Sequence, residues 1–401
     1  MTKRVALAVV VLALVAAVVF VPTAKAAQPH AKWLYLLYLD ADNSLDVNAG
    51  AHHVPVVESD FGELMSVGST RDVIAYVLVD RYAGPTNLFR VEKGALAEQT
   101  GFALDGQEAN MGDPATLRSF VAYASTAARP DHSLLVFWDH GSPNYVAFDE
   151  HAGPGGGTDR LTHQEVIQAL DGYHVDVVAA DECLVAQLEV AYEYVAGGLQ
   201  ADYLVAAETY TGWRGFPYDW TLQALVDHPE LNARETAIMV VQETQRLLSA
   251  APYSGEEVND HAAIDLAQVR TLGSSVLALA NLLMSDMKAN ADLVSKARAA
   301  GVYSYGTNAL NLVDLKTFAL RIVDGTSSPE IRDAGAIVAA NVDVAVVAIQ
   351  ATKTTNHQVS GIGLALPNHA KEVPEYYAAF AFPSAGWMEF LTAYWAASGA
   401  V

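Results

Sequence analysis

Basic residues are scarce in this sequence of 401 residues. Lys and Arg number 23 against 46 Asp and Glu, which gives a formal net charge of −23 at pH 7. Nucleic-acid binding depends on clustered Lys and Arg that neutralise phosphates, so no nucleic acid is expected as a partner. The negative charge suits cationic or basic substrates, and it is equally explained as an adaptation for solubility or salt.

Long apolar runs are also lacking, except at the N-terminus. There Lys3 and Arg4 precede the uncharged run Val5–Val21, and a small-x-small tripeptide ends at Ala26. This pattern predicts a signal peptide over residues 1–26 and a secreted or extracellular protein. An uncleaved N-terminal membrane anchor is the alternative, and the protein would contact a membrane only if that segment were retained. No later run reaches about 18 apolar residues, so no other span is expected.

Cysteine occurs once, at Cys183. Exported proteins commonly carry cysteines in disulfide pairs, and a single cysteine cannot form an intrachain bridge. A lone cysteine is ordinarily a small hydrophobic side chain of the core. Its sequence context therefore has to decide whether Cys183 has a chemical role.

Several common site motifs are absent. The sequence contains no Gly-x-Ser-x-Gly elbow, no His-Glu-x-x-His helix and no phosphate-binding loop, which excludes the usual serine hydrolases, zincins and nucleotide-dependent enzymes. His52 and His53 are adjacent without an evident third ligand, so we interpret them as surface residues. The acidic spacing over Asp40–Asp46 resembles half a calcium loop, but Leu45 replaces the required Gly and Ala51 the bidentate Glu, which excludes an EF-hand.

The chain after the N-terminal segment alternates short apolar runs with amphipathic segments. This alternation is typical of an α/β fold on a mostly parallel sheet, and runs that are apolar on both faces indicate helices on both sides. The predicted strands are Trp33–Asp40, Asp72–Asp80, Leu134–Asp139, Val175–Asp181 and Tyr203–Ala207. The predicted crossover helices are Asp113–Ala127, Thr162–Leu170 and Leu184–Ala196.

After about Pro252 the pattern becomes helical and rich in Ala. We therefore expect a core over residues 27–251 and a helix-rich C-terminal region over residues 252–401 that returns a last strand to the core. The segments of this second region are the helices Leu266–Met287 and Pro329–Gln350, the strand Ser360–Pro367 and a helix near Trp387–Ala397.

The reactive side chains stand where two predicted strands end. His140 follows Leu134–Asp139 directly, and Cys183 follows Val175–Asp181 after one residue. Ligands bind at the carboxyl edge of parallel sheets, so neighbouring strands would bring the imidazole and the thiol to one crevice. A cysteine and a histidine brought together in this way are typical of nucleophilic catalysis.

Two further features favour that chemistry. A helix beginning at Leu184 would place its N-terminal N–H groups and dipole beside Cys183 and favour the thiolate. Gly141 allows the backbone after His140 to approach a substrate closely, and the N–H groups of Gly141 and Cys183 could then form an oxyanion hole.

The combination of motifs resembles the caspase-like cysteine peptidases, and among them clostripain and its relatives. One strand ends in His140-Gly141-Ser142, and a later strand ends in Asp181-Glu182-Cys183. The similarity covers most of the mature chain and includes Tyr35–Leu45, Asp181–Val190, Ala207-Glu208 with Trp213, Pro217 and Tyr218, Val313-Asp314-Leu315 and Ser360-Gly361-Ile362.

The resemblance implies a caspase-like three-layer α/β sandwich and a cysteine endopeptidase that cleaves proteins or peptides after Arg or Lys. His140 and Cys183 would be the catalytic dyad. Asp181 matches the acid of the family's specificity pocket, although a strand-end or helix-capping carboxylate is an alternative role, and Glu208 is a second pocket candidate. The chemistry requires no cofactor, and calcium is left open as a structural or activating ion because relatives often respond to it.

Relatives are often made as inactive single chains that cut themselves after a basic residue between the His and the Cys. Arg160, beside the Gly-rich segment Ala152–Thr158, is the candidate here, with a plain surface arginine as the alternative. Pro143 and Asn144 stand where relatives usually have Gly and Trp. The resemblance therefore predicts the dyad but not the form of the substrate-side loop.

Two other functions are compatible with the sequence. A catalytically silent, exported binding protein on the same fold would be expected to have lost His140 or Cys183. A cysteine amidase for small amides would share the nucleophile but lack the acidic pocket.

Overall fold

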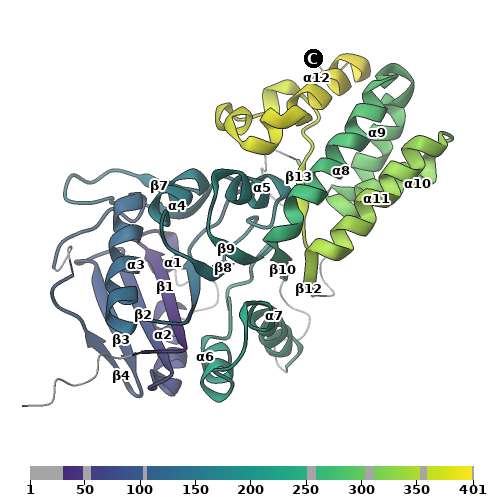
Figure 1. The fold of residues 1–401 in the computed structure, drawn as a ribbon. Helices are drawn as coiled ribbons and strands as arrows, with labels where there is room; N and C mark the ends of the chain where they lie inside the picture. The colour runs from purple at the N-terminus through teal and green to yellow at the C-terminus, as the bar shows by residue number, and fades with distance from the viewer. Residues whose placement is uncertain are drawn as a thin grey trace, which may run out of the picture.

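The computed structural model describes residues 30–47, 56–102, 106–250, 259–302, 311–352 and 359–399. Its main feature is a nine-stranded sheet in the order β12-β10-β9-β8-β5-β1-β2-β3-β4 (Figure 1). The predicted signal peptide over residues 1–26, His52 and His53 lie outside the described residues.

The centre of the sheet is parallel. It consists of β9 (Ala201–Ala206), β8 (Val175–Asp181), β5 (His132–Trp138), β1 (Trp33–Ala41) and β2 (Val73–Arg81). Antiparallel strands extend both sides. Beyond β9 come β10 (Asp260–Asp265) and then β12 (Val346–Ala351), and beyond β2 come β3 (Asn87–Glu92) and then β4 (Ala95–Glu98). The predicted mostly parallel α/β sheet is confirmed.

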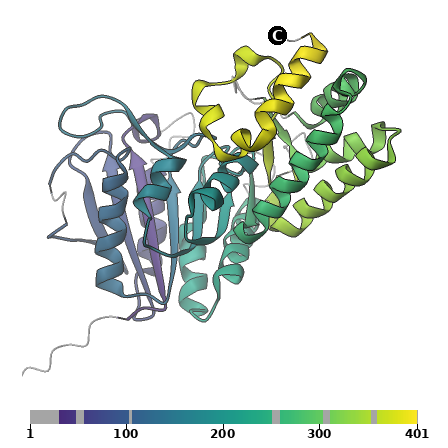
Figure 2. The same cartoon turned by 45° about the horizontal axis from the view of Figure 1, so that its top comes forward.

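Helices cover both faces of this sheet (Figure 2). Along β1 the side chains alternate: Leu36 and Tyr38 join one buried cluster, whereas Leu37 and Leu39 join the other. The first cluster is covered by α3 (Pro114–Ala128), α4 (His163–Ala169) and α5 (Leu188–Gly197), and the second by α2 (Val56–Val67), α6 (Tyr218–Asp227) and α7 (Ala233–Ser249). The result is the expected three-layer sandwich.

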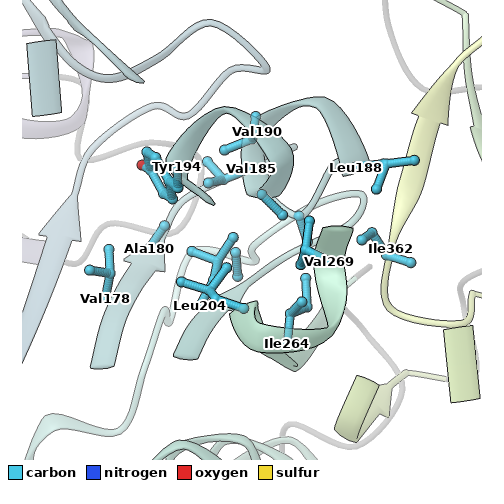
Figure 3. Packing of buried hydrophobic residues seen from close by; sticks show 14 of the residues in the cluster. Val178, Ala180, Val185, Leu188, Val190, Tyr194, Leu204, Ile264, Val269 and Ile362 are labelled. Carbon is cyan, nitrogen blue, oxygen red and sulfur yellow. The ribbon is translucent and has the colours of Figure 1, made fainter. Parts of the chain in front are cut away.

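The C-terminal region is mainly helical and packs against one end of the sandwich (Figure 1). Figure 3 shows the junction, where Val190 of α5, Leu204 of β9 and Val269 of α8 share one apolar cluster. The helices of the region are α8 (Leu266–Met284), α9 (Met287–Gly301), α10 (Leu315–Gly325), α11 (Pro329–Ala345) and α12 (Met388–Ser398). Among the described helices, α8 alone is long and apolar enough to cross a membrane, and half of its most apolar window is buried inside the protein.

Two short strand pairs and one short helix complete the part that concerns the site. Along the chain, the hairpin of β6 (Tyr145–Asp149) and β7 (Asp159–Thr162) comes after β5 and before α4. The short helix α1 (Ser44–Val47) follows β1. A separate two-stranded sheet joins β11 (Leu312–Asp314) and β13 (Gly363–Ala365).

The strands contributed by the C-terminal region differ from the expectation. The segment Ser360–Pro367 forms β13, which pairs with β11 and not with the main sheet. The strands that join the core are β10 and β12. The predicted helix Pro329–Gln350 ends at Ala345, because Val346, Val347 and Ile349 are β-branched residues that suit the edge strand β12.

Candidate active site

Three neighbouring parallel strands, β8, β5 and β1, end at the same edge of the sheet. Cys183 follows β8, His140 follows β5, and Ser44 follows β1. Because β5 lies between the other two strands, His140 stands between Cys183 and Ser44 along this edge. The sheet thus brings the two predicted reactive residues to one place, as parallel topology requires.

A cavity of about 300 Å³ opens at this edge. Its walls come from α1, the start of α2, the ends of β5 and β8, and the loop after β9. The residues that line it are Leu45, Val56, Trp138, Asp139, His140, Asp181, Glu182, Cys183, Tyr210, Thr211, Gly212, Trp213 and Gly215. Three predicted site residues, His140, Asp181 and Cys183, are therefore brought together around one cavity.

Cys183 is held mainly by the loop after β9. The N–H of Thr211 donates to Sγ over 3.4 Å, and Sγ lies 3.8 Å from the carbonyl oxygen of Thr211. Burial is the main cause that raises the pKa of the Cys183 thiol to about 11, while the Thr211 N–H opposes it. The resting sulfur is therefore a protonated thiol at neutral pH.

The expected helix directly after Cys183 is wrong. Helix α5 begins at Leu188, and Leu184 has a positive φ of 67°. The N–H groups of Leu184 and Ala186 donate to the carbonyl oxygens of Thr209 and Ala207, so this stretch runs alongside the segment after β9. No helix N-terminus lies at Cys183 among the described elements, and the helix dipole cannot be the source of thiolate stabilisation there.

Gly141 packs directly against the Cβ of Glu182 and the backbone of Cys183. A Cβ added at Gly141 would lie 2.3 Å from the carbonyl oxygen of Cys183 and 2.9 Å from its nitrogen. Only glycine fits this approach, since real Cβ atoms do not come so close to backbone. The two residues predicted to supply oxyanion N–H groups are thus backbone neighbours.

The His140 ring contacts Ser44. Its Nε2 lies 3.0 Å from the Ser44 hydroxyl oxygen, and burial lowers the pKa of His140. Asp139 is a buried carboxylate that accepts from the N–H groups of His140 and Phe148 and thereby fixes the start of this loop. A histidine with a lowered pKa is neutral at pH 7 and can accept a proton.

Asp181 is a buried carboxylate on the wall of the cavity. Its Oδ2 accepts from the N–H of Phe216 over 2.8 Å and from the hydroxyl of Tyr218 over 2.7 Å. Its Oδ1 is buried with no hydrogen-bond partner among the described residues. Burial, opposed by these two hydrogen bonds, raises the pKa of Asp181 to about 6.

Glu208 lies outside the cavity. Its side chain is fully buried, and Oε2 accepts from the N–H of Gly361, 2.8 Å away, in the C-terminal region. Burial first, and then the charge of Asp314, raise its pKa well above the ordinary value. The carboxylate thus links the sandwich to the segment before β13 instead of facing the cavity.

Arg160 lies on the exposed side of β7. Its guanidinium carbon is 4.5 Å from the centre of the Phe148 ring and 5.3 Å from the centre of the Tyr145 ring, both on β6. The Gly-rich segment Ala152–Thr158 joins these two strands. Arg160 is therefore held on a hairpin near the His140 loop.

Three residues of the site were not identified from the sequence. Ser44 contacts His140, and Thr211 contacts Cys183, but each is one polar residue in a loop without a sequence signal. Glu182 lines the cavity and is buried, with both carboxylate oxygens lacking a partner in the described part of the chain. Its position between Asp181 and Cys183 at a strand end could have indicated it.

The described residues offer one grouping that could hold a metal ion. Ligand atoms of His174, Asp176 and Asp202 lie within 4.8 Å of one another, at the amino ends of β8 and β9 and thus away from the cavity. In the acidic loop after β1, Asp42 pairs with His151 at 2.6 Å, and Asp46 pairs with Arg81 at 2.6 Å. These two loop carboxylates each have a basic side chain as partner in the protein, and calcium binding by this protein stays a prediction.

The fold and the site together define a class, the caspase-like cysteine peptidases. The sequence profile described as Clostripain family matches residues 37–395. The chain therefore belongs to the clostripain family, a family of cysteine peptidases, and the resemblance drawn from the motifs is confirmed.

Individual relatives agree with this assignment. Clostripain from Hathewaya histolytica is 34% identical over 126 residues, which are 28% of this chain and only 24% of that protein. A secreted C11 cysteine protease from Bacteroides thetaiotaomicron, solved with an irreversible peptide inhibitor, aligns with a TM-score of 0.63 at 18% identity over 91% of this chain and 99% of that chain. An inactive zymogen C11 protease from Parabacteroides distasonis aligns with a TM-score of 0.64 at 17% identity over 88% and 98% of the two chains. The two structures support the fold.

Proposed function

We propose that this protein is a secreted cysteine endopeptidase that cleaves peptide bonds after Arg or Lys. The observation that carries the proposal is the cavity where Cys183 and His140 meet Asp181. A buried carboxylate with one unpartnered oxygen is a suitable receptor for a guanidinium or an ammonium group.

Peptide hydrolysis would begin from a neutral pair. His140 takes the proton of the Cys183 thiol while the sulfur bonds to the carbonyl carbon of the substrate, and the N–H groups of Gly141 and Cys183 bind the oxyanion. The C–N bond then breaks, and the imidazolium of His140 protonates the leaving amine. Water, deprotonated by His140, hydrolyses the thioester and returns the thiol.

Asp181 would select the substrate through charge. Burial raises the pKa of Asp181 to about 6, so the carboxylate is mostly ionised at neutral pH. A bound Arg or Lys side chain would stabilise the ionised form further, since an opposite charge at short distance lowers a carboxyl pKa. An amidase for small neutral amides would have no use for this charge.

The test compares paired fluorogenic peptides with Arg, Lys or a neutral residue before the scissile bond. Activity toward Arg and Lys in the wild type, lost in Cys183→Ala and in His140→Ala, supports the peptidase. Asp181→Asn should reduce the preference for basic over neutral peptides by about 10-fold to 100-fold, because a charged hydrogen-bonded pair contributes about 1.5–3 kcal/mol. Turnover of small amides alone would favour the amidase, and no turnover of any substrate, with or without calcium and reductant, would favour a silent binding protein.

Self-processing after Arg160 belongs to the same proposal. It is supported by the exposed position of Arg160 beside the Gly-rich segment, and one structural relative was solved as an inactive zymogen. Because Arg160 is held on β7 by two aromatic rings, cleavage would require this end of the hairpin to open. On a gel, Arg160→Gln should stay a single chain while Arg71→Gln, a surface control, is processed. A processed Arg160→Gln chain would contradict the site.

Secretion is proposed from the N-terminal pattern of the sequence. Export to the medium with a mature chain beginning near Ala27 is the expected result, as determined by N-terminal sequencing. Retention in the membrane fraction with the full N-terminus would instead indicate an anchor.

A further inference from the structure

We propose that Ser44 is the residue that positions His140, holding the imidazole so that Nδ1 is the nitrogen that exchanges protons with Cys183 and the substrate. This inference rests on the proposed function, because it assigns a role within the same dyad. The observation behind it is the 3.0 Å contact between the Ser44 hydroxyl oxygen and Nε2 of His140.

The order of the strands supports this role. Ser44 follows β1, His140 follows β5 and Cys183 follows β8, and β5 pairs with both β1 and β8. Along the sheet edge His140 therefore stands between Ser44 and Cys183, and His140 and Cys183 line the same cavity. With Nε2 occupied by Ser44, Nδ1 is the ring nitrogen left for the reaction.

A buried hydrogen-bond network holds the loops of Ser44 and His140 in fixed positions relative to each other. Asn43 is fully buried, and its Nδ2 donates to Oδ1 of Asp139 over 2.7 Å and to the carbonyl oxygen of Phe148 over 3.2 Å. Its Oδ1 accepts from the N–H of Leu45 over 2.9 Å. Asn43 and Asp139 directly precede Ser44 and His140, so this amide–carboxylate contact ties together the two loops that carry them.

The hydroxyl suits both protonation states of the ring. A serine hydroxyl can accept a hydrogen bond from Nε2–H in the neutral and in the imidazolium form. The proton then stays on Nε2 throughout, while Nδ1 receives the thiol proton and later releases it to the leaving amine. In the absence of the hydroxyl the neutral ring could place its proton on Nδ1, and that tautomer cannot accept the thiol proton.

The decisive comparison is Ser44→Thr with Ser44→Val, which are nearly identical in shape but differ in the hydroxyl. Ser44→Val and Ser44→Ala should lower kcat by about 10-fold to 100-fold with KM little changed, as expected for a hydrogen bond to a charged group. Ser44→Thr should retain most of kcat. Val47→Ala, an exposed position on the same short helix, is the control for damage to α1.

The pH dependence separates positioning from a merely structural role. Removing an acceptor of Nε2–H destabilises the imidazolium more than the neutral ring, so the limb of the pH–rate profile that belongs to His140 should move to lower pH in Ser44→Val and not in Ser44→Thr. Loss of kcat in Ser44→Val and Ser44→Thr alike, or a lower kcat with an unmoved profile, would contradict the proposal. A rise in kcat in Ser44→Val would also contradict it and would show that Ser44 restrains His140.

Alkylation gives a readout that does not depend on peptide hydrolysis. The chain has one cysteine, so incorporation of iodoacetamide reports Cys183 alone. If His140 takes the thiol proton, His140→Ala and Ser44→Val should both slow alkylation near pH 7, and Ser44→Thr should not. This pattern would support the role of Ser44 even if no peptide were hydrolysed, whereas equal rates in all variants would overturn it.

Discussion

Gly141 is the position at which the loop after β5 comes closest to the backbone of Cys183. Gly141→Ala would force a Cβ to within 2.3 Å of the Cys183 carbonyl oxygen. The clash has no simple relief, because the nearest atoms are Cys183 backbone and the Glu182 Cβ, and none is the far end of a flexible side chain. We expect a loss of about 1–3 kcal/mol in the free energy of unfolding, as for overpacked cores. Peptidase activity should fall by about 100-fold or more, as when an oxyanion donor is displaced.

The control for this prediction is Gly155→Ala in the Gly-rich segment. An added Cβ at Gly155 meets nothing within 4 Å, so urea unfolding and peptide hydrolysis should stay close to wild type. Equal behaviour of the two variants would show that the close approach at Gly141 does not matter in solution.

The ionisation of Asp181 predicts an acid limit for basic substrates. Its pKa in the folded protein is raised from 3.8 to about 6 by burial, so the carboxylate gains a proton as the pH falls through about 6. The free enzyme should therefore lose kcat/KM for an Arg peptide below about pH 6, because the neutral acid attracts the guanidinium less. In Asp181→Asn this dependence should disappear; a limb that persists unchanged in the variant would belong to another group.

Helix α4 illustrates a case in which local chemistry and structure agree. Thr162 caps this helix: its hydroxyl accepts from the N–H of Glu165, whose carboxylate accepts from the Thr162 N–H. Thr162→Ala should lower the free energy of unfolding by about 1 kcal/mol, measured by urea denaturation. Gln168→Ala, an exposed change within the same helix, should leave it unchanged or slightly raised, and a similar loss in both variants would argue against the cap.

Helix α5 shows where local patterns mislead. The stretch from Leu184 to Gln187 continues the apolar pattern of the helix, yet its backbone pairs with the segment after β9. The hydrophobic pattern of these residues fits burial in either conformation. Pairing with the segment after β9, which is distant in sequence, favoured the paired, non-helical conformation over the helix. As a result, no helix N-terminus in the described part of the chain lies beside Cys183 to stabilise a thiolate.

At the scale of the whole molecule, the C-terminal region completes the sheet. Strand β10 pairs with β9, and the N–H of Gly363 donates to the carbonyl oxygen of Ala186 close to the site. A chain that ends at Ala250 would leave an open edge on β9 and expose the apolar surface of α5 that packs on α8. We expect such a chain to aggregate in gel filtration and to lack a cooperative thermal transition, whereas a chain that ends at Ser398 should behave like wild type. A monomeric, cooperatively folding truncated chain would show that residues 30–250 are an independent domain.

The sequence alone determined the parallel centre of the sheet, the placement of His140 and Cys183 at strand ends and membership in the clostripain family. These follow from local apolar runs and from short motifs, which are properties of neighbouring residues. Tertiary structure decided which strands of the C-terminal region reach the core, that Glu208 turns away from the cavity, and that Ser44 and Thr211 contact the reactive pair. Those features depend on backbone hydrogen bonds and burial between residues far apart in the chain, and no local pattern encodes them.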